Sequence, residues 1–347
     1  MNSAEPGGSG PLRVGLIGYG VAGRVFHAPF LAADPAYELA AVVTSQTARL
    51  AADHPSAVAV PDVDALLAHP GLDIVVVASP TPLHVAHATA AVDAGLATVV
   101  DKPFAPDAGS GRALIERAEA AGVPFTVFQN RRWDGDFLTL RRLVDDGTLG
   151  EVGRFESRFE WWKPSVDGSW KSTTGAVDGG GILFDLGAHL IDQALLLFGP
   201  AEVAHAEVRT RRGGAADDDV FVALEHASGT ASHLWMSAVA PIAGPRFRVL
   251  GSRSGFVSWG LDPQEQQLAG GMTPGDRRLG RASAPARLGT DSHPDELPLE
   301  AGDYAGFYRR LAAALRDGSS LPVDPRDSLA VLELIDTIHS QNRKRAS

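Results

Sequence analysis

Two segments of the chain carry lysine, aspartate and histidine side chains with the types and spacing that acid–base chemistry needs. Lys102 lies in Asp101-Lys102-Pro103, directly after an apolar run. A lysine at the end of a buried strand can donate a proton or a hydrogen bond to a reacting hydroxyl or carbonyl group, and partial burial lowers its pKa toward a useful range. The neighbouring Asp101 favours the charged form. The alternative is that Lys102 is an ordinary solvated surface charge.

The second segment is 179–192, GGGILFDLGAHLID, in which Asp185 and His189 are four residues apart. On a helix this spacing places both side chains on one face. A carboxylate beside an imidazole orients the ring and tunes its pKa, as a general acid–base pair requires. Two alternatives stay open: a zinc site and an ordinary core histidine. The sequence offers no third ligand and no HExxH motif, so we predict no metal site.

A glycine pattern near the amino terminus predicts the cofactor site. Gly18-Tyr19-Gly20-Val21-Ala22-Gly23 follows the apolar run 12–17 and opens the helix-like stretch 22–33. Strand, GxGxxG and helix in this order form the dinucleotide-binding fingerprint, because the glycines allow a tight turn and close approach of the pyrophosphate. The helix N-terminus then presents N–H groups to the phosphates. The alternative is a glycine-rich turn that binds nothing.

Two loops at other strand ends are expected to contact the same cofactor, since ligands of open α/β sheets bind at the carboxyl ends of the strands. The first follows the apolar run 74–78, where hydrogen-bonding and stiffening residues stand close together. The second follows the strand predicted at 39–44. The predicted contacts are Ser79, Pro80, Thr81 and His84 in the first loop and Thr44 and Ser45 in the second. A proline-capped helix start is the alternative for the first loop.

The second loop also bears on the choice between NAD and NADP. NAD-preferring sites place an acid about 20 residues beyond the glycines to bind the ribose diol. No acid occurs between Glu38 and Asp53 here, and Ser45 can donate a hydrogen bond to a 2′-phosphate. Arg49 or Arg24 could supply positive charge. The sequence therefore favours NADP and leaves NAD open.

Composition limits the class of protein that can carry these residues. The chain has 347 residues, a formal net charge of −11 and no cysteine, and its pI is about 5.4. The acidic balance argues against nucleic acid or an anionic membrane as a partner, and the absence of cysteine excludes disulfides and thiolate catalysis. No apolar run spans a bilayer, and the first residues lack the features of a signal peptide. We therefore expect a cytoplasmic protein.

The pattern of apolar runs predicts two domains behind a disordered tail at 1–11. In 12–128, short apolar strands alternate with helices, which is typical of a Rossmann domain, a doubly wound α/β unit with a parallel sheet. In 129–347, helices flank strands joined by short turns, which predicts an α+β domain with a largely antiparallel open sheet. We expect 260–289 to be loop and the C-terminal helices within 303–340 to pack back on the first domain.

Taken together, GYGVAG, VASPTPLH, DKP and GGGILFDLGAHLID resemble the Gfo/Idh/MocA oxidoreductases over nearly the whole chain. In that family a lysine from an E-K-P motif acts with an aspartate and a histidine from a D-x-x-x-H helix. The resemblance places these roles on Lys102, Asp185 and His189. Asp101 replaces the family's glutamate, which keeps the charge and shortens its reach.

A narrower resemblance, to the NADP-dependent scyllo-inositol dehydrogenase branch, rests on 25–30, 129–137 and 185–199. It implies that Trp170 and Lys171 lie near the nicotinamide, where relatives have a Trp-Arg pair, and that Asn130 is a site residue. The arginines of the same Asn-Arg-Arg-Trp run could equally bridge the domains. Gln46 stands where members of this branch tend to have arginine.

The leading hypothesis is an NAD(P)-dependent oxidoreductase that transfers a hydride between nicotinamide and a ring carbon of a polyol or sugar, with an inositol-like substrate favoured. His189 would exchange the hydroxyl proton while Lys102 polarises the oxygen and Asp185 orients the site, although the first two could trade roles. The alternative is a non-catalytic dinucleotide-binding sensor, which has no need of these three side chains.

The predicted open sheet also bears on assembly. Helices can cover only one face of an antiparallel sheet in this arrangement, so the other face is a candidate subunit interface. We expect a homodimer or homotetramer, with Trp235, Phe247 and Val249 contributing to the contact.

Overall fold

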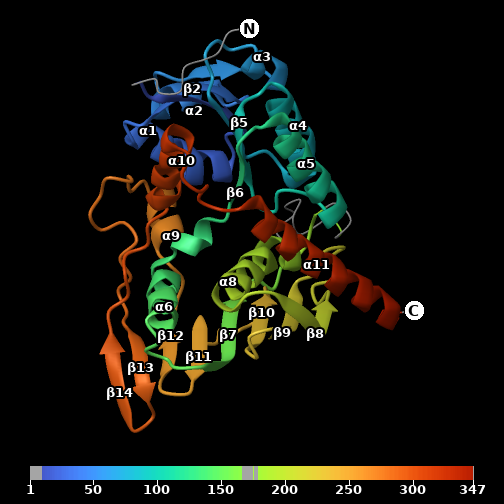
Figure 1. The fold of residues 1–347 in the computed structure, drawn as a ribbon, viewed down its shortest axis with the longest axis vertical. Helices are drawn as coiled ribbons and strands as arrows, with labels where there is room; N and C mark the ends of the chain where they lie inside the picture. The colour runs from blue at the N-terminus through green and yellow to red at the C-terminus, as the bar shows by residue number, and fades with distance from the viewer. Residues whose placement is uncertain (1–9, 166–174, 176–178, 347) are drawn as a thin grey trace.

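The computed structural model of this chain describes residues 10–165, 175 and 179–346. Over these residues the strands form two sheets, one in each half of the chain, and the two halves lie end to end (Figure 1). Trp170 and Lys171, which the resemblance placed at the nicotinamide, lie outside the described residues.

The strands of the first half form a parallel sheet. Among the described residues it has six strands in the order β3-β2-β1-β4-β5-β6, and every neighbouring pair is parallel. The strand order reverses between β1 and β4, which is where ligands bind in doubly wound sheets. This confirms the predicted Rossmann domain. Its strands are β1 (Leu12–Ile17), β2 (Tyr37–Val43), β3 (Val58–Val60), β4 (Ile74–Val77), β5 (Ala97–Asp101) and β6 (Phe125–Phe128).

The central strands of this sheet are apolar because helices cover both of its faces. All four residues of β4 are fully buried, as expected for a parallel strand with helices above and below it. The helices begin and end at recognisable signals: Asp107 accepts a hydrogen bond from the Ser110 amide at the start of α5, and Gly122 ends it in the left-handed conformation. These helices are α1 (Ala28–Ala33), α2 (Thr47–Asp53), α3 (Val63–Leu67), α4 (His84–Asp93) and α5 (Ala108–Ala121).

The second half contains a mixed sheet. In the described part of the chain it has eight strands in the order β14-β13-β12-β11-β7-β10-β9-β8, antiparallel except for the pair β7 and β10. The prediction of a largely antiparallel sheet is confirmed. The strands are β7 (Val152–Glu160), β8 (Ala201–Arg209), β9 (Asp219–His226), β10 (Ala231–Ser237), β11 (Phe247–Gly251), β12 (Gly255–Ser258), β13 (Ala286–Thr290) and β14 (His293–Leu297).

The prediction that 260–289 is entirely loop is wrong. The helix α9 (Gln264–Ala269) lies within this range, and β13 begins at Ala286 and pairs with both β12 and β14. These strands form a projecting hairpin whose side chains on β14 are almost all exposed. Strand β14 carries no alternation of apolar and polar residues and β13 alternates over only three residues, which explains why the sequence pattern missed them.

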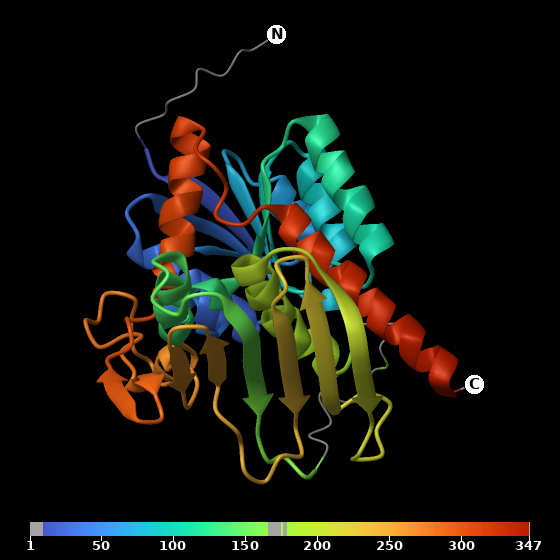
Figure 2. The same cartoon turned by 60° about the horizontal axis from the view of Figure 1, so that its bottom comes forward.

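One face of the mixed sheet is packed against α6 (Gly135–Asp145), α8 (Ala188–Phe198) and α11 (Pro325–Ala346). Figure 2 shows the opposite face, over which no described helix lies. Phe247 and Val249 are fully buried within the chain, so the prediction that they contribute to a subunit interface is wrong. Trp235 alternates with buried Leu234 and Met236 on β10 and lies on the open face beside Phe221.

The two C-terminal helices join the halves. Helix α10 (Ala305–Asp317) packs on α1 in the first half, and α11 packs on both α5 and β8. On α11, Asp336 accepts a hydrogen bond from the Ala108 amide at the start of α5 (2.9 Å), and the His339 ring stacks on Phe184 at 5.5 Å. Helix α11 is therefore part of both domains.

No helix in the described part of the chain has the length and apolar character needed to cross a membrane.

Candidate active site

A cavity with a volume of about 1040 Å³ lies between the two halves. This is at the upper end of the range for ligand sites. Its lining comes from the fingerprint turn, from the carboxyl ends of β5 and β6, and from helix and loop residues of the second half. The lining residues that matter below are Val21, Ala22, Asp101, Lys102, Asn130, Arg131, Trp161, Lys163, Asp185, His189, Trp259, Asp262 and Glu265.

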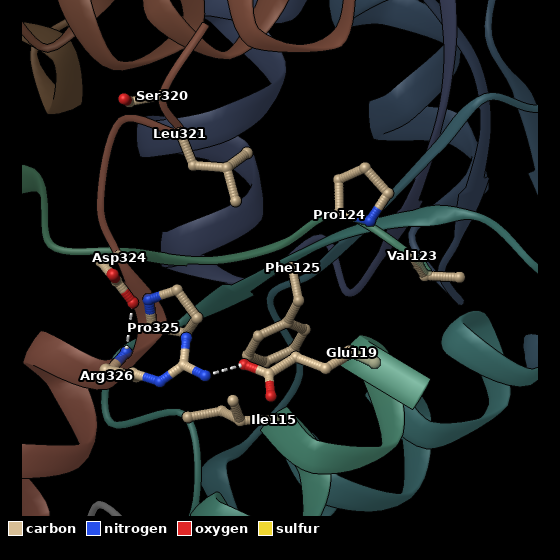
Figure 3. A pocket seen from close by; sticks show the side chains of 11 residues that line it. Ile115, Glu119, Val123, Pro124, Phe125, Ser320, Leu321, Asp324, Pro325 and Arg326 are labelled. Atoms are coloured by element: carbon tan, nitrogen blue, oxygen red, sulfur yellow. Dashed lines mark hydrogen bonds and ion pairs between the residues drawn. The ribbon is translucent and has the colours of Figure 1, made fainter. Parts of the chain in front are cut away.

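A second cavity of about 360 Å³ lies at the opposite, amino end of β6 (Figure 3). Its walls combine apolar side chains, among them Ile115, Phe125 and Leu321, with polar side chains such as Glu119 and Arg326. The charged groups labelled in Figure 3 are engaged with protein partners: the Arg326 guanidinium bonds the Glu119 carboxylate at 2.6 Å. A ligand site needs polar groups that converge on its occupant, and here the ion pair between Arg326 and Glu119 already engages two of the charged groups. The interdomain cavity is the candidate site.

Three predicted residues meet on one wall of the interdomain cavity. Lys102 follows β5, and its Nζ donates to the Asp185 carbonyl oxygen at 2.5 Å and lies 3.3 Å from Asp185 Oδ1. His189 follows Asp185 by four residues and is buried to 4% exposure. An ammonium, a carboxylate and an imidazole thus border one space, which is the donor and acceptor set that proton exchange with a hydroxyl requires.

The helix that carries Asp185 and His189 begins with a wider turn than the predicted α-helix would have. Its first turn, η5 (Leu183–Gly187), is π-helical, and α8 continues from it. π-Turns of this kind occur frequently at functional sites. The helix within 22–33 shows the same departure, since η1 (Ala22–His27) is π-helical and α1 follows. Both segments that approach the cavity therefore begin with a wide turn.

Buried Asp217 holds the start of η5. Its Oδ2 accepts from the Leu183 amide at 2.8 Å, and its carbonyl accepts from the Ile182 amide at 2.9 Å. Gly181 has a φ of +101°, and a Cβ there would lie 2.1 Å from Asp217 Oδ1, so only glycine fits. Burial raises the pKa of Asp217 to about 6, even though the backbone hydrogen bonds lower it.

The fingerprint turn has the shape that a dinucleotide needs. A Cβ at Gly18 would lie 2.6 Å from the Ala78 carbonyl oxygen, and one at Gly23 would lie 2.0 Å from the Gly18 carbonyl oxygen. These two glycines are required by backbone packing. A Cβ at Gly20 would meet nothing within 4 Å, so the backbone there faces open space in which a pyrophosphate can approach. The residues present therefore fit the cofactor.

The loop after β2 lies beyond the lining of the cavity. Thr44 Oγ1 accepts from the Gln46 amide at 2.9 Å, and Ser45 is exposed. Gln46 Nε2 donates to the Tyr19 carbonyl oxygen at 2.9 Å, and the Tyr19 hydroxyl donates to Asp53 Oδ2 at 2.9 Å. The Tyr19 side chain is buried, so any contact to the cofactor from this residue is a backbone contact. The loop is thereby tied to the fingerprint turn.

The loop after β4 has a partly structural role. His84 is buried, and its two ring nitrogens lie 2.8 Å from the Pro103 carbonyl oxygen and 2.7 Å from that of Ser79. Because its hydrogen bonds are made to the backbone, the predicted ligand contact of His84 is wrong. Ser79 Oγ lies 3.0 Å from His87 Nδ1, and Thr81 is 5% exposed within η2 (Thr81–Leu83). Pro80 precedes that turn, and none of the four lines the cavity.

Sequence reasoning missed several cavity residues. Arg131 follows Asn130 in η3 (Asn130–Trp133), and its guanidinium bonds Glu265 of α9 at 2.7 Å and lies 4.9 Å from the Phe159 ring. Nothing in the sequence distinguishes this arginine from Arg132 beside it, which joins η3 to α8 and α11 instead. The missed residues also include Trp161, Lys163, Trp259, Asp262 and Glu265.

Arg132 shows what a structural bridge looks like in the same run. It bonds both carboxylate oxygens of Asp192 on α8, at 2.8 and 2.6 Å, and Asp327 on α11 at 3.0 Å. The arginine is 7% exposed. Arg132 therefore joins η3 to α8 and α11 within the second half of the chain rather than bridging the two domains, and Asp192 is its structural partner.

The charges around the cavity are nearly balanced. Among the described lining residues, the basic side chains are Lys102, Arg131 and Lys163, and the acidic ones are Asp101, Asp185, Asp262 and Glu265. The described residues provide no excess of positive charge that would select an anionic substrate. No group of three or more histidine, cysteine or acidic side chains among the described residues could hold a metal ion.

Both halves of the chain match known protein families. A model of the oxidoreductase family's NAD-binding Rossmann fold matches residues 12–129, and a model of the GFO/IDH/MocA C-terminal domain matches residues 137–257. The chain is 32% identical to scyllo-inositol 2-dehydrogenase (NADP(+)) IolW of Bacillus subtilis (strain 168), over 96% of this chain and 94% of that protein. It is 36% identical to the uncharacterized oxidoreductase YdgJ of Escherichia coli (strain K12), over 97% of this chain and 98% of that protein.

A solved structure extends the likeness to the arrangement of the two domains. The structure of yvaA from Bacillus subtilis superposes with a TM-score of 0.92 at 31% sequence identity, and the match covers 97% of each chain. The likeness therefore includes the placement of both sheets around the interdomain cavity.

Proposed function

The chain belongs to the GFO/IDH/MocA family of oxidoreductases and is an NAD(P)-dependent dehydrogenase of CH–OH groups, and from this premise we propose that its substrate is a cyclic polyol or sugar, with an inositol-like ring favoured. The observation that carries the proposal is the convergence of Lys102, Asp185 and His189 on the cavity that the fingerprint turn also borders.

Each of these side chains has a distinct part in the proposed reaction. When bound, the nicotinamide accepts or supplies the hydride at the ring carbon. His189 takes the proton of the substrate hydroxyl during oxidation and returns it during reduction. Lys102 donates a hydrogen bond to the same oxygen and stabilises its developing negative charge. Asp185 holds the lysine ammonium through its carbonyl and carboxylate oxygens.

The lining of the cavity supports a neutral polyhydroxylated ring as substrate. Arg131 is engaged by Glu265 at 2.7 Å and by Asp134 at 3.4 Å, so its charge is already compensated. Trp161 and Trp259 contribute aromatic surface to the cavity for the apolar C–H side of a ring, while Lys102 and Asn130 contribute polar groups for its hydroxyls. The relative named for an inositol supports the same class.

For the cofactor we propose a preference for NADP. No acid ends β2, and exposed Ser45 and Arg49 stand in and after the loop that follows it. An acid there would repel a 2′-phosphate, whereas a hydroxyl and a guanidinium can bind it. Arg49 donates to Gln46 at 3.0 Å, which keeps the guanidinium near this loop. The relative named as NADP-dependent supports the assignment.

A sensor that only binds the dinucleotide is the competing function. The test is steady-state turnover with a panel of inositols and sugars and both cofactors, followed by the absorbance of reduced nicotinamide. The wild type is expected to turn over at least one cyclic polyol or sugar, and Lys102→Ala combined with His189→Ala should abolish turnover while cofactor binding remains. Cofactor binding without turnover of any member of the panel would favour the sensor.

We also propose that the chain forms a homodimer or homotetramer through the open face of the mixed sheet. On this face Arg158 lies 3.9 Å from the Trp235 ring, and Phe221 contacts the same ring at 5.0 Å. Light scattering should give a mass of at least two chains for the wild type. Trp235→Asp should shift it toward the 36.4 kDa monomer, and a monomeric wild type at micromolar concentration would contradict the proposal.

A further inference from the structure

A buried histidine lies behind the lysine of the candidate site. His27 is the last residue of η1 and has no exposed surface. Its Nδ1 lies 2.5 Å from the hydroxyl oxygen of Tyr308 on α10, and its ring packs on Phe128 with centroids 4.4 Å apart. Its Nε2 points to Asp101, at 3.8 Å from Oδ2. The ring thus lies between α10 and the carboxyl end of β5, next to Lys102.

The contacts of His27 bear on its tautomer. Burial raises the pKa of Tyr308 far above its ordinary value, with Tyr37 and Asp101 contributing in the same direction, so the phenol keeps its proton and can donate it to Nδ1. The ring hydrogen is then on Nε2. Among the described residues Nε2 has no hydrogen-bond partner within ordinary distance, and a buried donor without a partner is unfavourable. Asp101 is the acceptor that the geometry offers.

Asp101 connects this ring to Lys102. Its Oδ1 accepts from the Lys102 amide at 2.8 Å, and the carboxylate borders the cavity. Burial by itself raises the pKa of Asp101. The neighbouring His27, His84 and Lys102 lower it by a larger amount, so the pKa of Asp101 lies below its ordinary value. The carboxylate therefore stays ionised, and its position fixes the backbone from which the Lys102 side chain extends.

We propose that His27 is a positioning residue for the dehydrogenase reaction, which acts through Asp101 to orient Lys102. The Tyr308 hydroxyl binds Nδ1 of the ring, Nε2 faces the Asp101 carboxylate at 3.8 Å and stabilises its position, and Asp101 Oδ1 accepts from the amide of Lys102. No proton is transferred along this chain of contacts during turnover. The inference rests on the proposed function, because it takes Lys102 as the residue that contacts the substrate oxygen.

The first test needs no substrate. In protein labelled with ¹⁵N at histidine, long-range ¹H–¹⁵N correlation spectra report the tautomer of each ring, and His27→Asn assigns the His27 signal. We expect a proton on Nε2, and a change of the His27 nitrogen shifts in Asp101→Asn. A His27 ring protonated on Nδ1 alone, or shifts that do not respond to Asp101→Asn, would overturn the proposal even if no substrate were known.

The second test compares two substitutions that keep different halves of the ring's hydrogen bonding. His27→Gln can place an amide N–H near the position of Nε2, whereas His27→Asn can place one only near Nδ1. We expect His27→Asn to lower kcat about 10- to 100-fold and to shift the pH dependence of kcat/KM, with cofactor KM changed less than threefold. His27→Gln should recover most of the loss.

Two controls separate this role from a structural one. His293→Asn removes an exposed histidine on β14 and should leave all kinetic constants unchanged. Thermal unfolding of each variant reports folding. Equal losses in His27→Asn and His27→Gln, or a loss of kcat with an unmoved pH profile, would overturn the positioning role. A wild type inactive on every polyol and sugar would instead count against the proposed function, and the tautomer measurement would still stand.

Discussion

The two ends of strand β6 border two cavities that differ in how their charged groups are used. At its amino end, Pro124 and Phe125 line a space whose arginine is already bonded to Glu119. At its carboxyl end, Phe128 and Asn130 line a larger space that receives charged side chains from both domains. In a doubly wound sheet only the carboxyl ends of the strands bring loops and helix N-termini together. The convergence of charged groups from both domains therefore distinguishes the candidate site from the second cavity.

The largest effect is expected when the cation that lines each cavity is removed, which tests whether only the interdomain cavity takes part in the reaction. Lys102→Met removes the ammonium from the interdomain cavity and keeps a similar side-chain length, so kcat/KM should fall by about 10³-fold. Arg326→Met makes the corresponding change in the second cavity and should leave kcat/KM within twofold. Steady-state kinetics on the best polyol of the panel measures both. Similar losses in the two variants would erase the contrast.

Substitution of Asp217, which holds the start of η5 beside the interdomain cavity, tests whether its buried carboxyl group lowers the unfolding free energy once it ionises. Its folded pKa is about 6, raised from 3.8, so the folded state binds the proton more tightly than the unfolded state. The resulting stabilisation is full below about pH 4 and is lost as the pH rises through about 6. Relative to Asp217→Asn, the wild type should lose up to about 3 kcal/mol of unfolding free energy over this range. Parallel denaturation curves from pH 4 to 7 would contradict this assignment.

A substitution in the loop after β2 tests whether the cofactor site extends from the cavity to Ser45. Ser45→Asp places a carboxylate where we propose the 2′-phosphate of NADP, so the ratio of kcat/KM for NADP over NAD should fall about tenfold. Ser56→Asp, an exposed change beyond α2, is the matched control and should leave the ratio unchanged. A wild type with kcat/KM for NAD equal to or above that for NADP would refute the preference itself.

The smallest effect is expected in the second cavity. Glu119→Gln removes one partner of an exposed ion pair, and such pairs contribute about 0–1 kcal/mol. Unfolding free energy should therefore change by less than about 1 kcal/mol, and kcat/KM by less than twofold. A large kinetic effect of Glu119→Gln would show that the two ends of β6 are coupled and would contradict the functional difference between the two cavities.

Sequence patterns predicted the parts of the fold that repeat a simple rule. Continuous apolar runs such as 74–77 predicted the parallel strands, and the glycine spacing at Gly18 predicted the fingerprint turn. The same patterns missed the hairpin of β13 and β14, because exposed strands have no buried face to mark them. They also read 22–27 and 183–187 as α-helix, since a π-turn differs from an α-turn by hydrogen-bond register, which composition does not encode.

The candidate site divides in the same way. Lys102, Asp185 and His189 could be named in advance because their residue types and motifs carry chemistry, and the structure places them on one cavity. Arg131 and Glu265 could not, because their pairing joins η3 to α9 across 134 positions of sequence. His27 was visible only as part of a motif. Its contact with Asp101 depends on how η1 packs against β5, a property of tertiary structure alone.

Helix α11 has a consequence for how the cavity receives its ligands. It caps α5 in one domain through Asp336 and stacks on Phe184 of the other through His339. A change in the angle between the domains must therefore break one of these contacts or bend the helix. Contacts that oppose such a change lower the entropic cost of ordering the two walls of the cavity around a ligand.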